Sequence, residues 1–278
     1  MKQFCQKYYP RFAIFFLIFT VSVSAQVFIP SDPISLKYFE RDQYLNKSKI
    51  HSTFIRPFVR DYVGRKFELR FTTEGYFNTD VPNQENMDVR YFGKGIGQYI
   101  AFQAAYFGRF FAFVFEPYML GGDNRYSEEV KRVSPFSVLN DYRIIEKQNF
   151  SGGGLRQAAF FLHWKGIGIG YGKWNQWWGG GQHTSIAMTN NTHPFTAFHL
   201  GTIKEIMFKN IGFMGRYVFS KMNEYEDYRA VYYTALTLGI TYYSKTIISV
   251  GLSRNYLSGG YIIGVPWTAK DAANIIFE

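Results

Sequence analysis

A cluster of tryptophans followed by glycines and amides is the part of this sequence best suited to bind a ligand. Trp174, Trp177 and Trp178 come first, then three glycines, and further on an Asn pair ahead of a proline. Trp rings pack on the apolar faces of sugars, and side-chain amides match sugar hydroxyls as donors and acceptors. The combination predicts a glycan-binding loop. The candidate glycan-binding residues are Trp174, Trp177, Trp178, Gln182, Asn190 and Asn191.

The same tryptophans also suit structural roles. A Trp at a strand end is typical of the aromatic belt at a membrane interface, which fits Trp174 as well as sugar binding does. The adjacent pair Trp177 and Trp178, with glycines directly after it, favours a packed loop that folds inward. Loss of a Trp would lower glycan affinity in the first case and the yield of folded protein in the second.

The sequence lacks the spacing of the common catalytic and metal sites. No two of its histidines stand at the helical spacing of metal ligands. Ser185 lacks the G-x-S-x-G pattern of a nucleophile elbow, and its best partners would be His183 or His163. We therefore expect no enzymatic activity, no metal and no cofactor. The histidines are His51, His163, His183, His193 and His199.

Residues 1–25 have the regions of a secretory signal peptide. A basic start precedes a continuous apolar run over 12–23, and small residues end at Ala25, so Gln26 is the expected mature N-terminus. The run is short of the ~20 apolar residues of a spanning helix. An uncleaved anchor is the alternative. Because the only cysteine, Cys5, lies in this region, the mature chain would have no disulfide and no thiolate chemistry.

The composition favours strands that cross a membrane. Aromatic residues make up 20% of the chain, with 29 Phe and 22 Tyr, yet the mean hydropathy is only −0.17. Strands that are apolar on one face, polar on the other and bounded by aromatic girdles have this composition. A soluble β-sandwich is the alternative. The formal charge of +10 predicts anionic partners such as lipopolysaccharide phosphates or acidic polysaccharide, and export argues against nucleic acid.

From residue 66 onward the apolar residues recur with the period of a β-strand. In one such run Phe111, Phe113 and Phe115 are expected to face lipid, and Ala112 and Glu116 the lumen. Short turns alternate with long polar connections, which is the layout of an outer-membrane barrel. The alternating runs are 67–72, 100–106, 111–116, 157–164, 166–172, 211–217, 231–243 and 246–256. The expected turns are 107–109, 165–166, 209–212 and 243–245, and the long connections are 119–152 and 175–198.

The segment before these strands has a different pattern. Ser31-Asp32-Pro33 can cap and start a helix, with Leu36, Phe39 and Tyr44 near one face of it. A disordered linker is the alternative. The expected organisation is a signal peptide over 1–25, a helical or linker segment over 26–62 and a β-barrel region over 63–278.

Glycines occupy alternate positions from 166 to 172. Their spacing does not fit the dinucleotide-binding fingerprint. They place small residues on one face of a predicted strand. Two interpretations remain open: a loop, strand or plug approaches the inner wall closely there, or the strand simply curves.

The stretch 172–194 resembles the signature region of the Wzi family of outer-membrane capsule-assembly proteins. The residues that carry the resemblance are Trp174, Trp177, Trp178, Gly179, Gly180, Gly181, Ser185, Ile186, Asn190, Asn191 and Pro194, with Gly251 to Arg254, Trp267 and Asp271 further on. The resemblance implies an outer-membrane barrel of about eighteen strands with a small internal helical element. It also implies binding of capsular polysaccharide at the cell surface.

The expected fold class is therefore all-β: an antiparallel transmembrane barrel with a short N-terminal helical segment. The alternating runs provide only about ten strands of the length a barrel needs. The chain is thus expected either to be a truncated product or to close a smaller barrel. The expected function is to bind capsular polysaccharide at the bacterial outer membrane and assist capsule assembly or attachment, with lipid, lipopolysaccharide and other capsule-export components as further partners. A porin-like channel is the alternative.

Overall fold

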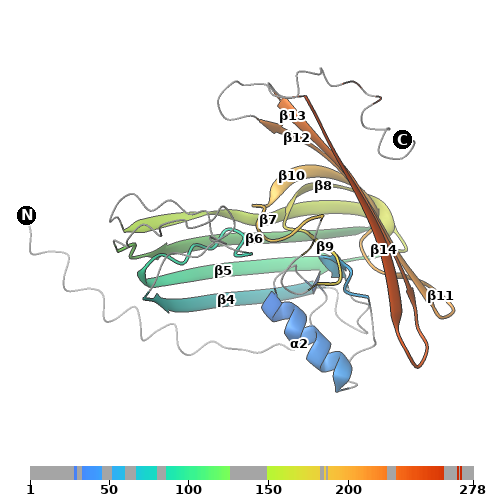
Figure 1. The fold of residues 1–278 in the computed structure, drawn as a ribbon, viewed down its shortest axis with the longest axis horizontal. Helices are drawn as coiled ribbons and strands as arrows, with labels where there is room; N and C mark the ends of the chain where they lie inside the picture. Colours follow the sequence, from blue (N-terminus) through green and yellow to red (C-terminus); the bar gives the residue numbers. More distant parts are fainter. Residues whose placement is uncertain are drawn as a thin grey trace, which may run out of the picture.

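A computed structural model describes residues 28–29, 33–45, 52–59, 67–79, 86–125, 149–181, 185, 187–223, 230–259, 268 and 270. The expected signal peptide and its cleavage site lie outside the described residues. The described part consists of one large antiparallel sheet, with one helix and several short strands against one of its faces (Figure 1). The all-β fold with a short N-terminal helix is confirmed.

The large sheet has ten strands. Nine follow the path β14-β13-β12-β10-β8-β7-β6-β5-β4, and the short β11 pairs only with β12. Every pair is antiparallel, and in the described residues β4 and β14 are the two edges, so the sheet is open. The strands are β4 (Phe67–Asn78), β5 (Gly95–Phe107), β6 (Phe111–Gly122), β7 (Phe150–Trp164), β8 (Ile167–Trp174), β10 (Phe195–Thr202), β11 (Ile206–Phe208), β12 (Ile211–Asn223), β13 (Ala230–Tyr242) and β14 (Ile248–Gly259).

The two faces of the large sheet differ as the period-two pattern predicts. On β6, Phe111 and Phe115 are 40% and 44% exposed, whereas Ala112 and Glu116 are buried on the other face. The alternation expected for this run is confirmed, with Phe113 part-exposed between the other two rings, whereas contact of the exposed face with lipid stays a prediction. Every long strand presents a large apolar side chain on the exposed face: Phe71, Phe102, Phe115, Phe160, Ile169, Phe198, Phe213, Ile240 and Val250.

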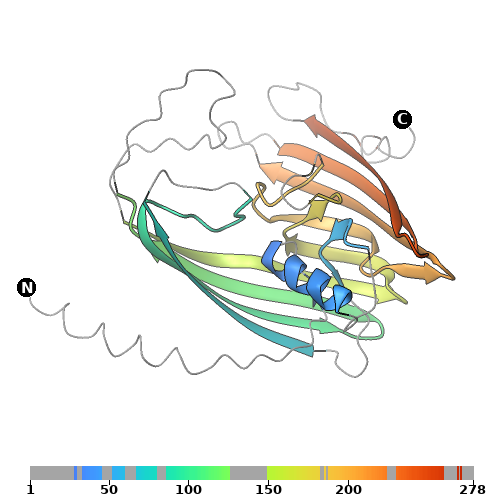
Figure 2. The same ribbon diagram turned by 60° about the horizontal axis from the view of Figure 1, so that its bottom comes forward.

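A small inner layer covers the opposite, concave face, as Figure 2 shows. Its helix packs Phe39 against Phe58, with ring centroids 5.5 Å apart, and both rings join a buried cluster with Met214 and Val218 of the sheet. The concave side is thus filled rather than open in its β8–β13 half. The layer consists of α2 (Pro33–Tyr44), the pair β1 (Phe28–Ile29) and β3 (Phe58–Val59), and the pair β2 (Ile55–Arg56) and β9 (Trp177–Trp178).

The helix begins at Pro33, where the capping pattern predicted a start. Leu36 and Phe39 are buried, as expected for one face. Tyr44 is 86% exposed, so its expected place on that face is wrong. It follows Phe39 by five residues, which is not a spacing that keeps two side chains on one side of a helix. Within the described residues, the helical structure is neither long nor apolar enough to cross a bilayer.

The alternate glycines allow a close approach by the neighbouring strand. A Cβ added to Gly170 would overlap the ring of Phe161, which leans across from β7. The sequence left two interpretations open, and at Gly170 the close approach of a neighbouring strand is the one that applies. The glycine leaves room for an inward-facing aromatic ring directly against the sheet.

The long connections are shorter than expected, and one of the longer strands, β10, was missed along with the short β9 and β11. β10 begins at Phe195, inside the stretch 175–198 that had been interpreted as loop, because Pro194 interrupts the pattern just before it. Likewise β6 runs to Gly122 and β7 starts at Phe150. Pro117 lies within β6 at a register shift, which is the kind of position where strands tolerate proline.

Candidate functional site

The tryptophan segment folds inward. Trp174 ends β8, and the next two tryptophans form β9, which pairs with β2 so that Trp177 lies opposite Arg56 and Trp178 opposite Ile55. The side chains are almost completely buried, at 3%, 0% and 1% exposure in chain order. Ser185 holds the segment from the other side, since its hydroxyl donates to the Trp178 carbonyl.

The faces of two of these tryptophans are occupied by buried arginines. The Arg56 guanidinium lies 4.7 Å from the Trp177 ring, and the Arg216 guanidinium lies 4.8 Å from the Trp174 ring. Arg216 also donates to the Pro57 carbonyl at 2.8 Å, which ties β12 to the inner layer. Desolvated cation–π pairs of this kind contribute about 2 kcal/mol each. The sequence predicted that sugars stack on these rings. In this arrangement the ring faces are buried, so sugar stacking is not seen and stays a prediction.

The amides of the same segment join loops that lie far apart in the sequence. Asn175 Nδ2 donates to Asn190 Oδ1 at 2.8 Å. The Asn190 carbonyl accepts from the Asp88 amide at 2.9 Å, and Asn191 Oδ1 accepts from the Asn86 amide at 2.6 Å. Asn190 is buried and Asn191 is exposed. Among the predicted glycan residues that the structure describes, only Asn191 therefore presents its side chain to solvent; Gln182 lies outside the described residues.

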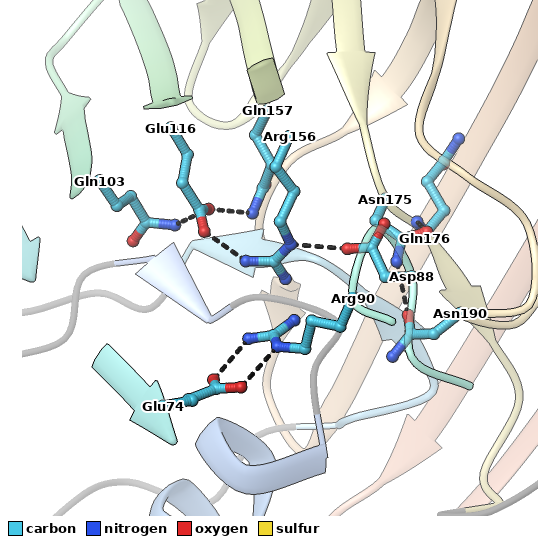
Figure 3. Close-up of polar contacts among 10 residues, drawn as sticks. All are labelled: Glu74, Asp88, Arg90, Gln103, Glu116, Arg156, Gln157, Asn175, Gln176 and Asn190. Carbon is cyan, nitrogen blue, oxygen red and sulfur yellow. Dashed lines mark hydrogen bonds and ion pairs between the residues drawn. The ribbon is translucent and has the colours of Figure 1, made fainter. Parts of the chain in front are cut away.

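A buried ionic network lies beside this segment (Figure 3). Arg156 of β7 donates through Nε to Asp88 at 2.6 Å and through Nη1 to Glu116 of β6. Glu116 also accepts from the amides of Gln103 at 3.0 Å and Gln157 at 2.6 Å. Arg156, Asp88 and Glu116 have side chains at most 4% exposed. The network fixes the 86–94 loop to the inner wall of β5, β6 and β7.

A second ion pair fastens the same loop to β4. Arg90 donates through Nε and Nη2 to the two carboxylate oxygens of Glu74, each at 2.7 Å. Its guanidinium also lies 4.3 Å from the ring centroid of Tyr99, which faces inward from β5. Bidentate pairing adds directional specificity to the charge attraction. Two arginines therefore hold one short loop against four strands of the sheet.

Burial and a neighbouring cation shift the pKa of one carboxyl group in this network in opposite directions. Burial raises the pKa of the Asp88 carboxyl, and the nearby Arg156 guanidinium opposes that shift without cancelling it. Asp88 is thus a carboxylate whose charge depends on Arg156. Removal of that arginine would leave Asp88 and Glu116 buried without their cation, which is one of the larger penalties in protein interiors.

Little in the sequence pointed to this network. Glu116 was expected to face inward, and it does, but its partner Arg156 lies next to the register shift that breaks simple alternation. Asp88 belongs to a connection without a period. The signal that could have drawn attention to them is a charged residue on the inward face of an aromatic strand, because such a charge needs a partner.

The two catalytic candidates that the structure describes, His163 and Ser185, form no hydrogen bond with each other. His163 stacks on Phe107 with ring centroids 4.9 Å apart, and the Ser185 hydroxyl donates to a carbonyl rather than to an imidazole. His183 lies outside the described residues. In the described part of the chain, no three His, Cys, Asp or Glu side chains gather in a way that could hold a metal ion.

The fold and the inward-packed tryptophan segment define an all-β protein with an amphipathic antiparallel sheet and a plugged concave face. The family model of capsule assembly protein Wzi matches residues 71–278. The chain belongs to this family, and membership supports a role in capsule assembly. The family's proteins are outer-membrane capsule-assembly proteins that are generally not enzymes. No curated protein and no solved structure matches the chain.

Proposed function

We propose that this chain is an outer-membrane β-barrel protein that binds surface polysaccharide and assists capsule assembly or attachment. The observation that carries the proposal is the reversed polarity of the sheet: its exposed face is apolar and its covered face holds the ionic network. A soluble sheet buries its apolar face instead. Together with family membership, this polarity favours lipid outside and protein inside.

The strand lengths support the membrane part of the proposal. β5, β12 and β13 have 13 residues each, which exceeds the ~9–11 residues that a tilted strand needs to cross the hydrocarbon core. The exposed face carries apolar cross-strand rows, such as the row Phe213, Ile240 and Val250. Such rows would form part of the lipid-facing band of a barrel.

The polysaccharide part of the proposal concerns the end of the sheet that carries the long connections. The glycan-binding residues predicted from the sequence would have two different roles here, one structural and one in sugar contact. Trp174, Trp177, Trp178 and Asn190 would hold the segment in shape from beneath. Asn191, which is exposed, would contact the sugar, and Gln182 stays a predicted contact. The support is the rigid mounting of Asn191 by Asn86 and by its bonded neighbour Asn190.

A channel is the second candidate, and the inner layer argues against it. Phe39, Ile55, Phe58 and Trp178 fill the concave side against the sheet. The ionic network adds a polar but anchored loop next to this plug. An open lumen lined by free charge, which a porin requires, does not fit this filling. A liposome-swelling assay would separate the two functions: swelling by small sugars would support a channel.

The direct test is binding of purified capsular polysaccharide to the folded full chain, normalised to the folded fraction. Asn191→Ala should weaken binding roughly two- to tenfold, because one net hydrogen bond contributes about 0.5–1.5 kcal/mol. Thr192→Ala is a matched control, since Thr192 is also exposed and adjacent. Absence of polysaccharide binding by the wild-type chain would refute the proposed function. Equal binding by both variants would remove Asn191 from the site.

A further inference from the structure

The short turns of the large sheet form one continuous edge, which we call the turn rim. It consists of residues 108–110, 165–166, 203–210 and 243–247, which lie along the same end of the sheet (Figure 1). Backbone hydrogen bonds join neighbouring turns: the His163 amide donates to the Phe110 carbonyl, Ile203 to Gly166, and Tyr243 to Asn210, each at 2.8–2.9 Å. The turns therefore act as one surface rather than as separate loops.

Each turn presents one exposed cation. Arg109, Lys165, Lys209 and Lys245 are all exposed, and none forms an ion pair with a described carboxylate. The only acidic residue in the four turns is Glu205, which is buried. The solvent side of the turn rim is therefore uniformly positive. Outside the rim, five arginines of the described residues form ion pairs with carboxylates: Arg41, Arg70, Arg90, Arg125 and Arg156.

The rim cations stand beside exposed aromatic rings. The Lys165 ammonium lies 4.8 Å from the Trp164 ring centroid, and the Arg109 guanidinium lies 5.0 Å from the Phe110 centroid. Trp164 is 65% exposed and Phe110 is 55% exposed. A Trp ring with an adjacent basic group is typical of the boundary between hydrocarbon and head groups, where the ring enters the interface and the cation meets phosphate.

Glu205 holds the rim in shape. Its carboxylate accepts from the Tyr243 hydroxyl at 2.7 Å and from the Ser52 amide at 3.3 Å. Burial and the neighbouring carboxylate of Glu205 raise the pKa of the Tyr243 phenol, so this hydroxyl stays protonated and keeps donating. The one acid of the rim is thereby directed inward and does not offset the exposed cations.

We propose that the turn rim binds the phosphate groups of anionic phospholipids in the leaflet on its side of the membrane. This inference rests on the proposed membrane location of the chain. Short turns lie on the periplasmic side of outer-membrane barrels, and the leaflet there consists of phospholipid rather than lipopolysaccharide. Basic residues close to an anionic surface attract it additively, by about a fivefold change in affinity for each residue.

The test uses the folded full chain in mild detergent, titrated with short-chain phosphatidylglycerol and, separately, with short-chain phosphatidylcholine. Binding is read by native mass spectrometry. Lys165 and Lys209 both have φ of 53°, so both are replaced by Asn, which tolerates this conformation. The double variant K165N/K209N should bind phosphatidylglycerol on the order of 20-fold more weakly. The matched control K221Q/R254Q removes two exposed cations outside the rim and should leave the affinity unchanged.

A second pair, R109Q/K245Q, repeats the measurement at the other two turns and covers the case in which the Asn variant folds poorly. Equal affinity for the two lipids, or equal losses in rim and control variants, would overturn the inference. Tighter binding of purified lipopolysaccharide than of phosphatidylglycerol by the rim would overturn the assignment to phospholipid. Flotation of the wild-type chain with phosphatidylcholine liposomes tests membrane insertion separately. A chain that does not float but still binds phosphatidylglycerol through the rim would contradict the proposed membrane location alone.

Discussion

Replacement of Trp177 by alanine should destabilise the folded chain severely. The ring is completely buried between β2 and the sheet, so its loss opens a cavity as well as removing apolar contacts. Trp-to-Ala changes in cores cost about 3–5 kcal/mol. The Arg56 guanidinium would also lose the ring that lies 4.7 Å away, a further cost of about 2 kcal/mol for a desolvated pair. The sum approaches the whole stability of many single domains.

The assay combines heat-modifiable gel mobility, which reports the folded fraction, with urea unfolding followed by circular dichroism. Trp164→Ala is the matched control: it removes the same ring from a position that is 65% exposed on the outer face. It should change the free energy of unfolding in detergent by less than about 1 kcal/mol. A Trp177→Ala variant as stable as this control would refute inward packing of the segment.

The same variants can distinguish a structural role of Trp177 from a role in sugar recognition. If Trp177 acts only from beneath, polysaccharide binding per folded molecule should fall less in Trp177→Ala than in Asn191→Ala. Asn191 is exposed and Trp177 is not, so the structure favours this order. The reverse order would mean that the ring turns outward to stack on sugar, and the buried arrangement would then not be the one that binds.

Three further substitutions test other parts of the structure. Arg156→Leu should cost about 3–5 kcal/mol at neutral pH, because it leaves buried carboxylates without their cation. Since the pKa of Asp88 is already raised in the folded state, that state takes up a proton before the unfolded state does, so the loss of stability in urea titrations should shrink as pH falls from 8 to 5. A loss of stability that is independent of pH would contradict this. Leu252→Lys, on the exposed face of β14, should cost ~2–4 kcal/mol in bilayers, and the adjacent, inward-facing Ser253→Lys distinctly less; equal costs would mean that the assigned register is wrong. Tyr243→Phe should cost about 1–3 kcal/mol in urea unfolding, because it removes a donor from a buried carboxylate; an unchanged midpoint would contradict that bond.

Strand periodicity predicted most of the large sheet, because each strand has one covered and one exposed face. Phe111, Ala112 and Glu116 lie on the faces that their spacing indicates. The pattern failed at Phe195, because the proline and polar residues just before it give no sign that β10 begins there. It also failed at Pro117, where the register shift interrupts the alternation. Local composition marks strands well but cannot show where a strand resumes after an irregularity.

The site was harder to predict than the fold. The sequence identified Trp177 and Asn191 as a connected segment, but it left open whether the rings point outward or inward. That choice depends on β2, which meets the segment from a distant part of the chain and covers the rings. The pairing of Asp88 with Arg156 is also non-local, since it joins a loop to a strand 68 residues away. No spacing rule links such residues before the fold is known.

The most direct test of the proposed role is the distribution of capsular polysaccharide between cells and culture medium. A strain that lacks this gene would be compared with the same strain carrying the wild-type chain or Asn191→Ala, at equal amounts in the envelope. Loss of the chain should shift polysaccharide from the cells into the medium, the wild-type chain should restore retention, and the variant should restore less. Equal cell-bound polysaccharide with and without the chain would contradict a role in holding capsule at the surface.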